Sequence, residues 1–354
     1  MADLIGEAPP QGNERRTRNG NNRTMAASAN EELERGLEAL AARLAPGGSM
    51  ANLRRLTAGA TQEVWRFELV EDGRQTPIIL RRAPGGTRVS DTAIGLETEA
   101  ALLEAAGAVG VPVPDVRYVL APEDGLGHGF LMGFVEGETL GGRIVKSEEL
   151  AGARTFLARQ CGEVLARIHT MNPDEFPRLR RSTPAELVDQ YRATYRASPT
   201  PRPVFELAFR WLDAHCPPPP EEMKLVHGDF RNGNLMIGPD GVRAVLDWEI
   251  AHVGDPMEDL GWICTSPWRF GMVDKPVGGF GEREDLWAGY EAAGGAPVKR
   301  DHALFWEVFG SMRWGVMCAS MVAAFRGADP SVERAVIARR TSENEIDLLR
   351  LLAA

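Results

Sequence analysis

The sequence has few cysteines, and none is placed as a disulfide framework or a metal site would require. Cys161, Cys216, Cys264 and Cys318 lie far apart, without a CxxC pair and without histidines at the spacing of a zinc site. A small disulfide-stapled module is excluded, because a chain of 354 residues has ample side chains for a core of its own. We expect reduced thiols with a packing role.

A long apolar run and a surplus of basic residues are also missing. The longest apolar stretch, from Trp314 to Phe325, is too short to span a bilayer, and the N-terminus lacks the basic and then apolar layout of a secretory signal. Lys and Arg number 40 against 50 Asp and Glu, a formal charge of −10 that provides no basic face for nucleic acid. We therefore expect a cytoplasmic protein that binds neither membrane nor nucleic acid.

The composition that is present is typical of a globular protein. The residues are 44% hydrophobic and 25% charged, values that exclude a wholly disordered or fibrous chain. The length fits two packed units or one large domain of two lobes. Residues 1–30 differ, because Gly, Asn, Pro and Arg stand where a core would require large apolar side chains. We predict a disordered tail there.

The residues after this tail predict a small lobe rich in strands. Leucines recur at helical spacing from Leu33 to Leu44, until Pro46-Gly47-Gly48 ends the run. Short apolar runs bounded by glycine follow, and Asp72-Gly73 between two of them is typical of a β-hairpin. The expected strands cover residues 53–56, 63–70, 76–82, 116–120 and 129–135, and one helix covers residues 91–106.

The pattern beyond Gly137 is mainly helical. The expected helices cover residues 150–171, 184–197, 203–215, 282–293, 301–325 and 331–352. The prolines at 217–220 predict a stiff connector. Residues 234–246 are the exception to the helical pattern, because two apolar runs joined by Gly238-Pro239-Asp240-Gly241 predict another hairpin. A polar-rich hairpin inside a helical lobe indicates a functional site.

The segment around this hairpin carries the residue types that phosphoryl transfer requires. Asp229 and Asn234 share one loop, and Asp247 ends the hairpin strand that returns beside them. A carboxylate can receive the proton of an acceptor hydroxyl, and hard oxygen ligands suit Mg²⁺ on nucleotide phosphates. The ordered set, more than any single residue, predicts a phosphotransferase site.

This ordered set resembles the aminoglycoside phosphotransferase and choline kinase superfamily, a branch of the protein-kinase-like fold. The family's HGDxxxxN loop matches His227 to Asn234, its metal-binding turn matches Asp247-Trp248-Glu249, and its GDPxxDL segment matches residues 254–260. The resemblance implies an α+β fold of two lobes. An antiparallel sheet with one helix is expected in residues 31–135, and a mainly helical lobe in residues 136–354.

The resemblance also implies the roles of the central residues. Asp229 is the catalytic base, and Asn234 and Asp247 are the Mg²⁺ ligands. ATP and Mg²⁺ are the implied cofactors, and the implied partner is a small molecule that carries a hydroxyl group.

Supporting roles are implied for three further residues. By resemblance, His227, Asp255 and Asp259 orient the loop that carries the base. Asp255 and Asp259 are spaced to share one face of a helix, so a helix cap and a solvated acid remain the alternative for this pair. His169 closes another helix, and we expect it to have a packing role.

On the nucleotide side the sequence departs from the family pattern in two places. The expected nucleotide-covering loop holds a single glycine, Gly59, and Arg81 occupies the strand position that is often Lys in the family. Arginine is a permanently charged phosphate binder, so the exchange is chemically acceptable, and Arg82 is the alternative. The pairing carboxylate is expected at Glu99, with Glu97 as the alternative. The residues expected to contact adenine are Met132, Gly133, Phe134 and Val135.

The acceptor is expected against aromatic residues after Asp247. Residues 262–271 read as a loop dense in aromatic side chains, a candidate apolar wall. The residues expected to line it are Trp262, Trp268, Arg269 and Phe270. This loop and residues 278–284 resemble a bacterial subgroup of these kinases related to the kinase-like domains fused to acyl-CoA dehydrogenases. That resemblance implies a bulky, partly apolar hydroxylated acceptor such as a hydroxyacyl thioester.

Two other functions remain open from the sequence. In the first, the acceptor is a cationic antibiotic, and clustered acidic side chains opposite Asp229 would favour it. In the second, the chain is a nucleotide-binding module without turnover, an interpretation that the single-glycine loop and Arg81 leave open and that intact Asp229, Asn234 and Asp247 oppose.

Overall fold

The computed structural model describes residues 30–45, 47–57, 62–83, 94–198, 200–327 and 332–353. Internal contacts divide the chain into two units, one of Met1–Arg88 with Arg117–Gly133 and one of Val89–Val116 with Phe134–Ala354. The tail predicted at residues 1–30 lies outside the described residues, except for Asn30, which is helical.

The first unit is built on one sheet, as the strand pattern predicted. The strand order is β1-β2-β3-β5-β4, and the pairs β1 with β2, β2 with β3 and β3 with β5 are antiparallel. Asp72 and Gly73 join β2 to β3 with positive φ at both residues, which confirms the predicted hairpin. The strands are β1 (Ser49–Thr57), β2 (Glu63–Glu71), β3 (Arg74–Ala83), β4 (Val116–Val119) and β5 (His128–Gly133).

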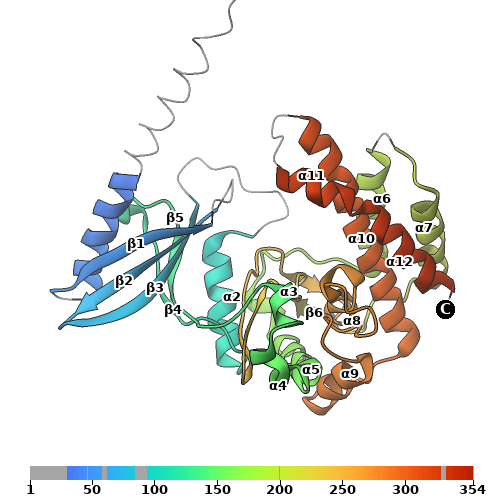
Figure 1. Cartoon of the computed structure of the whole chain (residues 1–354), viewed down its shortest axis with the longest axis horizontal. Helices are drawn as coiled ribbons and strands as arrows, with labels where there is room; N and C mark the ends of the chain where they lie inside the picture. The colour runs from blue at the N-terminus through green and yellow to red at the C-terminus, as the bar shows by residue number, and fades with distance from the viewer. Residues whose placement is uncertain are drawn as a thin grey trace, which may run out of the picture. The chain divides into compact units, whose positions relative to one another are not determined.

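The core of the first unit forms where one helix covers the sheet (Figure 1). Residues 30–44 are helical, and their buried leucines Leu33, Leu37 and Leu40 pack in one cluster with Trp65 and Leu80. Trp65 and Leu80 face each other across β2 and β3. The leucine spacing in the sequence is therefore the packing surface of this unit.

The helix α2 (Leu96–Ala108) groups with the second unit, although the sequence prediction placed it in the lobe of residues 31–135. The backbone is held there on both sides of the helix. The Ile94 N–H donates to the Glu249 carbonyl at 2.9 Å, and the Pro112 carbonyl accepts from the Val245 N–H at 2.8 Å. These long-range bonds have no counterpart in the local pattern from which the boundary was predicted.

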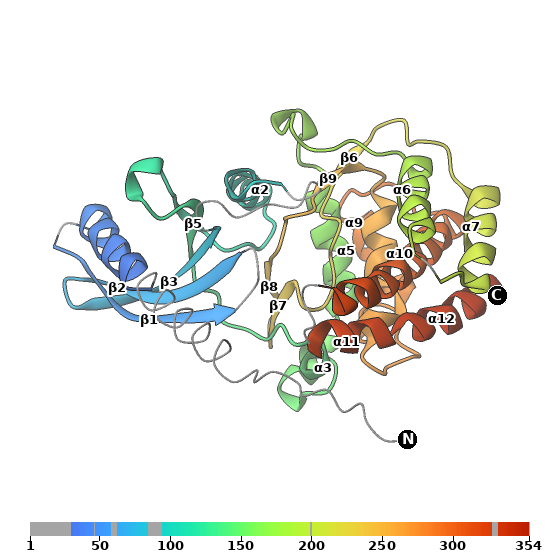
Figure 2. The ribbon, with the colours of Figure 1, turned by 90° about the horizontal axis from the view of Figure 1, so that it is seen from above.

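The second unit is mainly helical, as predicted. The helix α10 (Arg300–Arg326) runs through it and packs against α6 (Pro184–Arg196), α7 (Pro203–His215), α11 (Val332–Arg339) and α12 (Thr341–Ala353) (Figure 2). It also packs against α8 (Met257–Ile263). Together with α9 (Arg283–Ala292), the helices α6, α7 and α10 confirm four predicted helices to within two residues. No helix among the described residues is both long and apolar enough to cross a membrane.

Two predicted helices are divided in the structure. The helix expected at 150–171 is broken into α4 (Ala151–Arg154) and α5 (Leu157–Ile168), because Phe156 has a φ of −128°. The helix expected at 331–352 is broken at Arg340 into α11 and α12. A break of one or two residues changes little in the spacing of apolar side chains, so periodicity does not reveal it.

Four short strands in the second unit flank the segment that contains Asp229, Asn234 and Asp247. The predicted hairpin is confirmed as β7 (Leu235–Gly238) and β8 (Gly241–Val245). A second antiparallel pair, β6 (Lys224–Val226) with β9 (His252–Gly254), was not predicted, because strands of three residues carry no periodic signal. The helix α8 follows β9 and packs closely on α10, since a Cβ at Gly261 would lie 2.6 Å from the carbonyl carbon of Trp306.

The four cysteines are free thiols, as expected. Cys161, Cys264 and Cys318 are buried, and burial raises the pKa of each thiol. A buried thiol with a raised pKa is rarely ionised and therefore unreactive, which agrees with a packing role.

Candidate functional site

The loop of residues 227–234 lies between β6 and the hairpin β7–β8. The Leu246 N–H donates to the Asn234 carbonyl at 2.8 Å, so the end of the hairpin lies beside its beginning. Asp247 is the next residue and has a φ of 65°, a conformation that is rare outside glycine and that Asp tolerates better than most residues. The backbone therefore carries Asp247 back to the 227–234 loop.

Asp229 is held in this loop by three side-chain donors. The indole Nε1–H of Trp262 (2.8 Å) and the Nε–H of Arg231 (3.0 Å) donate to its Oδ1. The Nδ2 of Asn234 donates to its Oδ2 at 2.6 Å. The Asp229 side chain is still 15% exposed, so a small molecule can reach it. A fixed and accessible carboxylate suits a base that takes the proton of a bound hydroxyl.

Two further side chains carry oxygens of the kind that bind a metal ion. Asn234 donates through Nδ2 to Asp229, so Oδ1 is the atom of its amide that is able to bind a cation, and Asp247 carries a carboxylate. The described residues contain no group of three or more His, Cys, Asp or Glu that would hold a metal without other ligands. Two protein oxygens fit Mg²⁺, which is usually bound by one or two carboxylates together with substrate phosphates and water.

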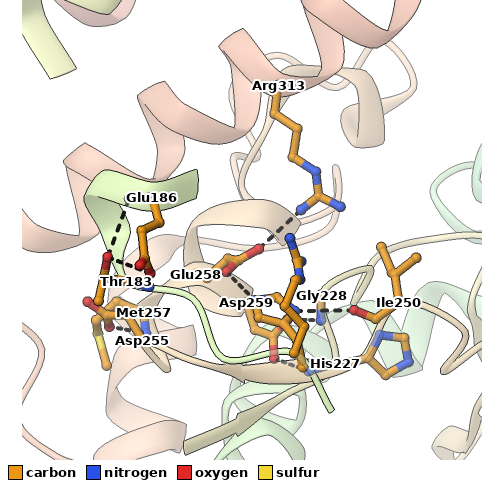
Figure 3. Close-up of polar contacts among 12 residues, drawn as sticks. Thr183, Glu186, His227, Gly228, Ile250, Asp255, Met257, Glu258, Asp259 and Arg313 are labelled. Carbon is orange, nitrogen blue, oxygen red and sulfur yellow. Dashed lines mark hydrogen bonds and ion pairs between the residues drawn. The ribbon is translucent and has the colours of Figure 1, made fainter. Parts of the chain in front are cut away.

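Asp259 on α8 fixes the backbone of the 227–234 loop (Figure 3). Its fully buried carboxylate accepts the N–H of His227 at 2.8 Å and the N–H of Gly228 at 2.9 Å. Nε2 of His169 lies 3.3 Å from the same carboxylate. Burial raises the pKa of Asp259, but the hydrogen bond and charge of His169 and the contacts with His227 outweigh it, so the pKa is lowered on balance. The carboxylate therefore stays ionised and anchors the loop.

Gly228 lets the loop pass close to the segment that precedes β9. Its φ is 78°, and a Cβ built there would lie 3.0 Å from the Ile250 carbonyl oxygen and 3.3 Å from Nδ1 of His252. Backbone conformation and space therefore both favour glycine at this position.

His227 is buried and neutral. Burial lowers its pKa, against the opposing influence of Asp259, Asp229 and Asp247. Its Nδ1 accepts the N–H of Asp229 at 3.2 Å, and its Nε2 lies 3.1 Å from the Leu246 carbonyl. This pattern assigns the proton to Nε2, so the imidazole links the start of the loop to the end of the hairpin.

The buried histidine makes stability depend on pH. Between the lowered pKa of folded His227 and its ordinary value of 6.5, the unfolded chain binds the proton and the folded chain does not. The free energy of unfolding contributed by this residue therefore falls as the pH drops below about 6.5. We expect the urea concentration at the midpoint of unfolding to be lower at about pH 5.5 than at about pH 7.5 in the wild type. The difference between the two pH values should be smaller in His227→Gln. An equal fall in both proteins would contradict a neutral His227.

Asp255 serves the helix α8 instead of the loop. Its Oδ1 accepts the N–H of Met257 at 2.9 Å, and its Oδ2 lies 2.6 Å from Nε2 of His302 on α10. The sequence left a cap and an orienting role open for Asp255 and Asp259. The structure gives Asp255 contacts with the first residue of α8 and with α10, and it gives Asp259 contacts with the backbone of the loop.

His169 connects Asp259 to Tyr290. Its Nδ1 lies 2.9 Å from the hydroxyl of Tyr290, and Nε2 faces Asp259. The packing role expected for His169 therefore includes support of the carboxylate that holds the loop. Its partners lie 121 and 90 residues away in sequence, so a histidine at a helix end gave no signal of this role.

A buried ionic cluster lies behind Trp262 and was not identified from the sequence. Glu258 pairs with Nη1 of Arg313 at 3.2 Å (Figure 3). It also pairs with Nε2 of His252 at 3.0 Å, and all three side chains are buried. Burial lowers the pKa of Arg313, but Tyr191, Glu258 and further neighbours raise it on balance, so the guanidinium is charged. It lies 4.2 Å from the ring centroid of Trp262, within cation–π range.

The first unit contains four of the residues expected to bind nucleotide, and the structure describes three of them, Arg81, Met132 and Gly133. Nε of Arg81 donates to Gln62 at 3.1 Å, whereas Arg82 pairs with Glu63 at 2.9 Å and also donates to a backbone carbonyl. The choice between Arg81 and Arg82 stays a prediction. Met132 and Gly133 end β5, and Gly59 lies outside the described residues.

The other expected nucleotide residues belong to the second unit. Glu99 is buried in the first turn of α2, whereas Glu97 is exposed, and the choice between them stays a prediction. Phe134 and Val135 directly follow β5 and are half-buried.

The candidate acceptor residues differ from a continuous aromatic loop. Trp262 lies in α8, and Trp268 lies in the short 3-10 turn η4 (Ser266–Arg269), so the prediction of a loop over 262–271 was wrong for these two residues. Both side chains are buried, and their rings meet edge to face with centroids 5.2 Å apart. A helix of seven residues and a 3-10 helix of four residues are too short to show a periodic apolar pattern in the sequence.

Arg269 and Phe270 also have defined neighbours. Nη2 of Arg269 donates to Glu307 at 2.9 Å and to the Cys264 carbonyl at 2.7 Å. Phe270 has a φ of 48° and remains 37% exposed, and its ring packs on Gly141 in α3 (Gly141–Ile144). Of the four candidates, Phe270 presents the largest free surface to a ligand.

Comparison with known proteins relates this chain to phosphotransferases. The sequence profile of the phosphotransferase enzyme family matches residues 52–295. Acyl-CoA dehydrogenase family member 10 of Mus musculus is 32% identical over 201 residues, which are 53% of this chain and 18% of that protein. Family member 11 of Gallus gallus is 27% identical over 228 residues, which are 61% of this chain and 28% of that protein. The chain thus spans less than a third of the length of these relatives.

Solved structures share the fold. A provisionally named aminoglycoside phosphotransferase from Ralstonia eutropha has a TM-score of 0.69 at 22% identity and covers 90% of this chain and 97% of its own. Spectinomycin phosphotransferase, solved with ADP and spectinomycin, has a TM-score of 0.61 at 13% identity, with coverage of 88% and 96%. An aminoglycoside phosphotransferase solved with AMP-PNP and hygromycin B has a TM-score of 0.59 at 15% identity, with coverage of 89% and 98%. At these identities the likeness establishes the fold, and it confirms the predicted α+β kinase-like class.

Proposed function

Because this chain belongs to the phosphotransferase enzyme family, we propose that it transfers the γ-phosphate of ATP to a hydroxyl group of a small molecule in a Mg²⁺-dependent reaction. The observation that supports this most is the arrangement at Asp229. Its carboxylate is fixed on both oxygens and still partly exposed, and the hairpin returns Asp247 beside Asn234. A positioned base beside two hard oxygen ligands is what phosphoryl transfer requires.

In this proposal each residue of the site has one task. Asp229 orients the acceptor hydroxyl and takes its proton, while Asn234 and Asp247 hold Mg²⁺. When bound, Mg²⁺ neutralises charge on the nucleotide phosphates. Asp259 and His227 keep the loop in place through its backbone. Two fold neighbours were solved with ADP or AMP-PNP, which supports ATP as the donor.

The proposed nucleotide site uses the residues expected from the sequence. Arg81 is the proposed phosphate contact, Glu99 is the carboxylate proposed to support it, and Gly59 is proposed for the nucleotide cover. Backbone groups of Gly133, Phe134 and Val135 hydrogen-bond the adenine, and Met132 flanks it. The proposed nucleotide residues all come from residues 31–135 of the sequence, and the proposed acceptor residues come from residues 136–354. We place the reaction in the cytoplasm, which the free thiols and the use of ATP support.

For the acceptor we propose a bulky, partly apolar hydroxylated molecule of the hydroxyacyl thioester kind. The curated relatives are named acyl-CoA dehydrogenase family members, which supports an acyl acceptor. The neighbours of Asp229 also support it, because they are indoles and guanidinium groups, such as Trp262 and Arg231. An aromatic and cationic surrounding suits an apolar or anionic molecule better than a polycation.

A cationic antibiotic is the second candidate, because fold neighbours were solved in complex with spectinomycin and with hygromycin B. It would need carboxylates free to bind ammonium groups. The buried carboxylates near the site are already engaged, Glu258 by Arg313, Glu307 by Arg269 and Arg283, and Asp255 by His302. This engagement favours the first candidate.

A nucleotide-dependent thermal shift tests the proposed site. We expect Mg²⁺ with ATP to raise the melting temperature of the wild type, and the shift to vanish in Asp247→Ala, because the site would lose one of its two protein oxygens for the metal. Phe270→Ala serves as the control and should keep the full shift, since it changes the expected acceptor side. The absence of a shift in the wild type would refute nucleotide binding, and with it the proposed reaction.

An acceptor screen decides between the candidates. Phosphate transfer from ATP is measured with hydroxyacyl thioesters and with aminoglycosides at equal concentrations. We expect turnover with the thioesters and little or none with the polycations. Preference for the aminoglycosides would overturn the acceptor proposal, and nucleotide binding without transfer to any acceptor would favour a module without turnover.

A further inference from the structure

Resting on the proposed transfer reaction, we propose that Trp262 is a positioning residue for the base: its indole N–H fixes Oδ1 of Asp229, so that the carboxylate meets the acceptor hydroxyl in one orientation. The bond is 2.8 Å long and joins α8 to the 227–234 loop. The indole is 2% exposed, so water does not compete for its N–H. The sequence predicted that this tryptophan contacts the acceptor, and that prediction did not include a contact with the base.

The indole is well suited to this task because its ring cannot turn. The guanidinium of Arg313 covers one side at 4.2 Å from the centroid, and the ring of Trp268 meets it edge to face. The backbone of α8 is also fixed, since Gly261 packs directly on Trp306 of α10. The direction of the Trp262 N–H is therefore set by packing on several sides.

Arg231 is the other donor to Oδ1, and it is less constrained. Its side chain is 24% exposed and lies over the ring of Trp268 at 4.4 Å. It also donates to the Asn232 carbonyl at 2.8 Å. The rigid donor at this oxygen is thus the indole, and Arg231 retains part of the orientation when the indole N–H is removed.

Trp306 provides a matched comparison. It is 1% exposed and contacts the same helix α8, but its Nε1 has no hydrogen-bond partner among the described residues. Exchange of either tryptophan for phenylalanine removes an indole N–H and a similar volume from the core. The two variants differ in whether that N–H binds Asp229.

The contact itself is tested by NMR of ¹⁵N-labelled indoles, independently of turnover. The Nε1–H signal of Trp262 is assigned by its loss in Trp262→Phe, and that of Trp306 by its loss in Trp306→Phe. We expect the Trp262 signal to shift in Asp229→Asn and the Trp306 signal to stay in place. A Trp262 signal that does not move in Asp229→Asn overturns the proposal.

The consequence for the reaction is tested by kinetics with saturating ATP and Mg²⁺, on an acceptor or on water. We expect kcat of Trp262→Phe to fall about tenfold with KM for ATP unchanged, as for the loss of one hydrogen bond to a charged group. Trp306→Phe should keep kcat within about twofold of the wild type. Equal kcat values in Trp262→Phe and Trp306→Phe would overturn the positioning role. A rise in KM for ATP that accounts for the whole loss of rate in Trp262→Phe would also overturn it. No turnover in the wild type would instead refute the proposed reaction, whatever the NMR result.

Discussion

Replacement of Asp229 by asparagine is expected to lower kcat by about 10²- to 10⁴-fold, while KM for ATP changes little. Asparagine keeps the shape of the side chain, and its Oδ1 can still accept from Trp262 and Arg231. It cannot take a proton at neutral pH. The fall in kcat therefore measures the contribution of Asp229 to proton transfer and to orientation of the acceptor, without a contribution from nucleotide binding.

The surroundings of Asp229 sharpen this expectation. Oδ2 of Asp229 accepts from Nδ2 of Asn234 at 2.6 Å, whereas an amide nitrogen at that position would face another donor. Asp229→Asn should thus also lose one hydrogen bond, with a cost of about 1–3 kcal/mol in the free energy of unfolding. Initial rates are measured at a temperature where both proteins are folded, with circular dichroism as the check.

Two results would count against the assignment of the base. Transfer to an acceptor at an undiminished rate in Asp229→Asn would mean that another group takes the proton. A loss of the thermal shift with Mg²⁺ and ATP in this variant would mean that Asp229 acts in nucleotide binding. The expected pattern is a retained shift with a lost rate, whereas Asp247→Ala should lose both the shift and the rate.

The parts of the fold that were predicted from the sequence are those that local patterns encode. Leucines at helical spacing predicted the helix over residues 30–44, and Asp72-Gly73 predicted the hairpin between β2 and β3. The same reasoning placed the hairpin at 234–246, and with it the return of Asp247 to the loop of Asp229. In each case, residues close in sequence decide the structure.

The parts that escaped prediction depend on contacts between distant residues. α2 groups with the second unit through backbone bonds near Glu249 and Val245. Trp262 was expected in an aromatic loop, but it lies in a buried helix and donates to Asp229. The apolar character of a tryptophan predicts that its ring is buried, but it does not predict which polar group the indole N–H contacts.

Replacement of Asp259 by asparagine is expected to lower both stability and kcat. The carboxylate accepts two backbone N–H groups, from His227 and Gly228, and faces Nε2 of His169. An asparagine side chain has one acceptor oxygen for these donors, so at least one buried donor loses its partner. We expect the free energy of unfolding to fall by about 2–4 kcal/mol, because each buried donor left unsatisfied costs about 1–3 kcal/mol and the ionic partner of His169 is lost as well.

Asp255→Asn is the matched comparison for this variant. Asp255 is equally buried, lies near the start of the same helix, and also pairs with a histidine and a backbone N–H. Its contacts hold α8 and α10, whereas those of Asp259 hold the loop of the base. Both variants should therefore lose stability, measured by urea unfolding.

Asp259→Asn and Asp255→Asn should differ in kcat. A displaced 227–234 loop moves Asp229 away from the acceptor hydroxyl, and a misplacement of about 1 Å can cost about 10²-fold in rate. We expect kcat of Asp259→Asn to fall by about that factor at temperatures where it remains folded, and kcat of Asp255→Asn to fall far less. If the two variants lost rate in proportion to their loss of stability, Asp259 would act only through the fold. A loss confined to Asp259→Asn would show that the hydrogen bonds to the backbone of His227 and Gly228 set the geometry of the base.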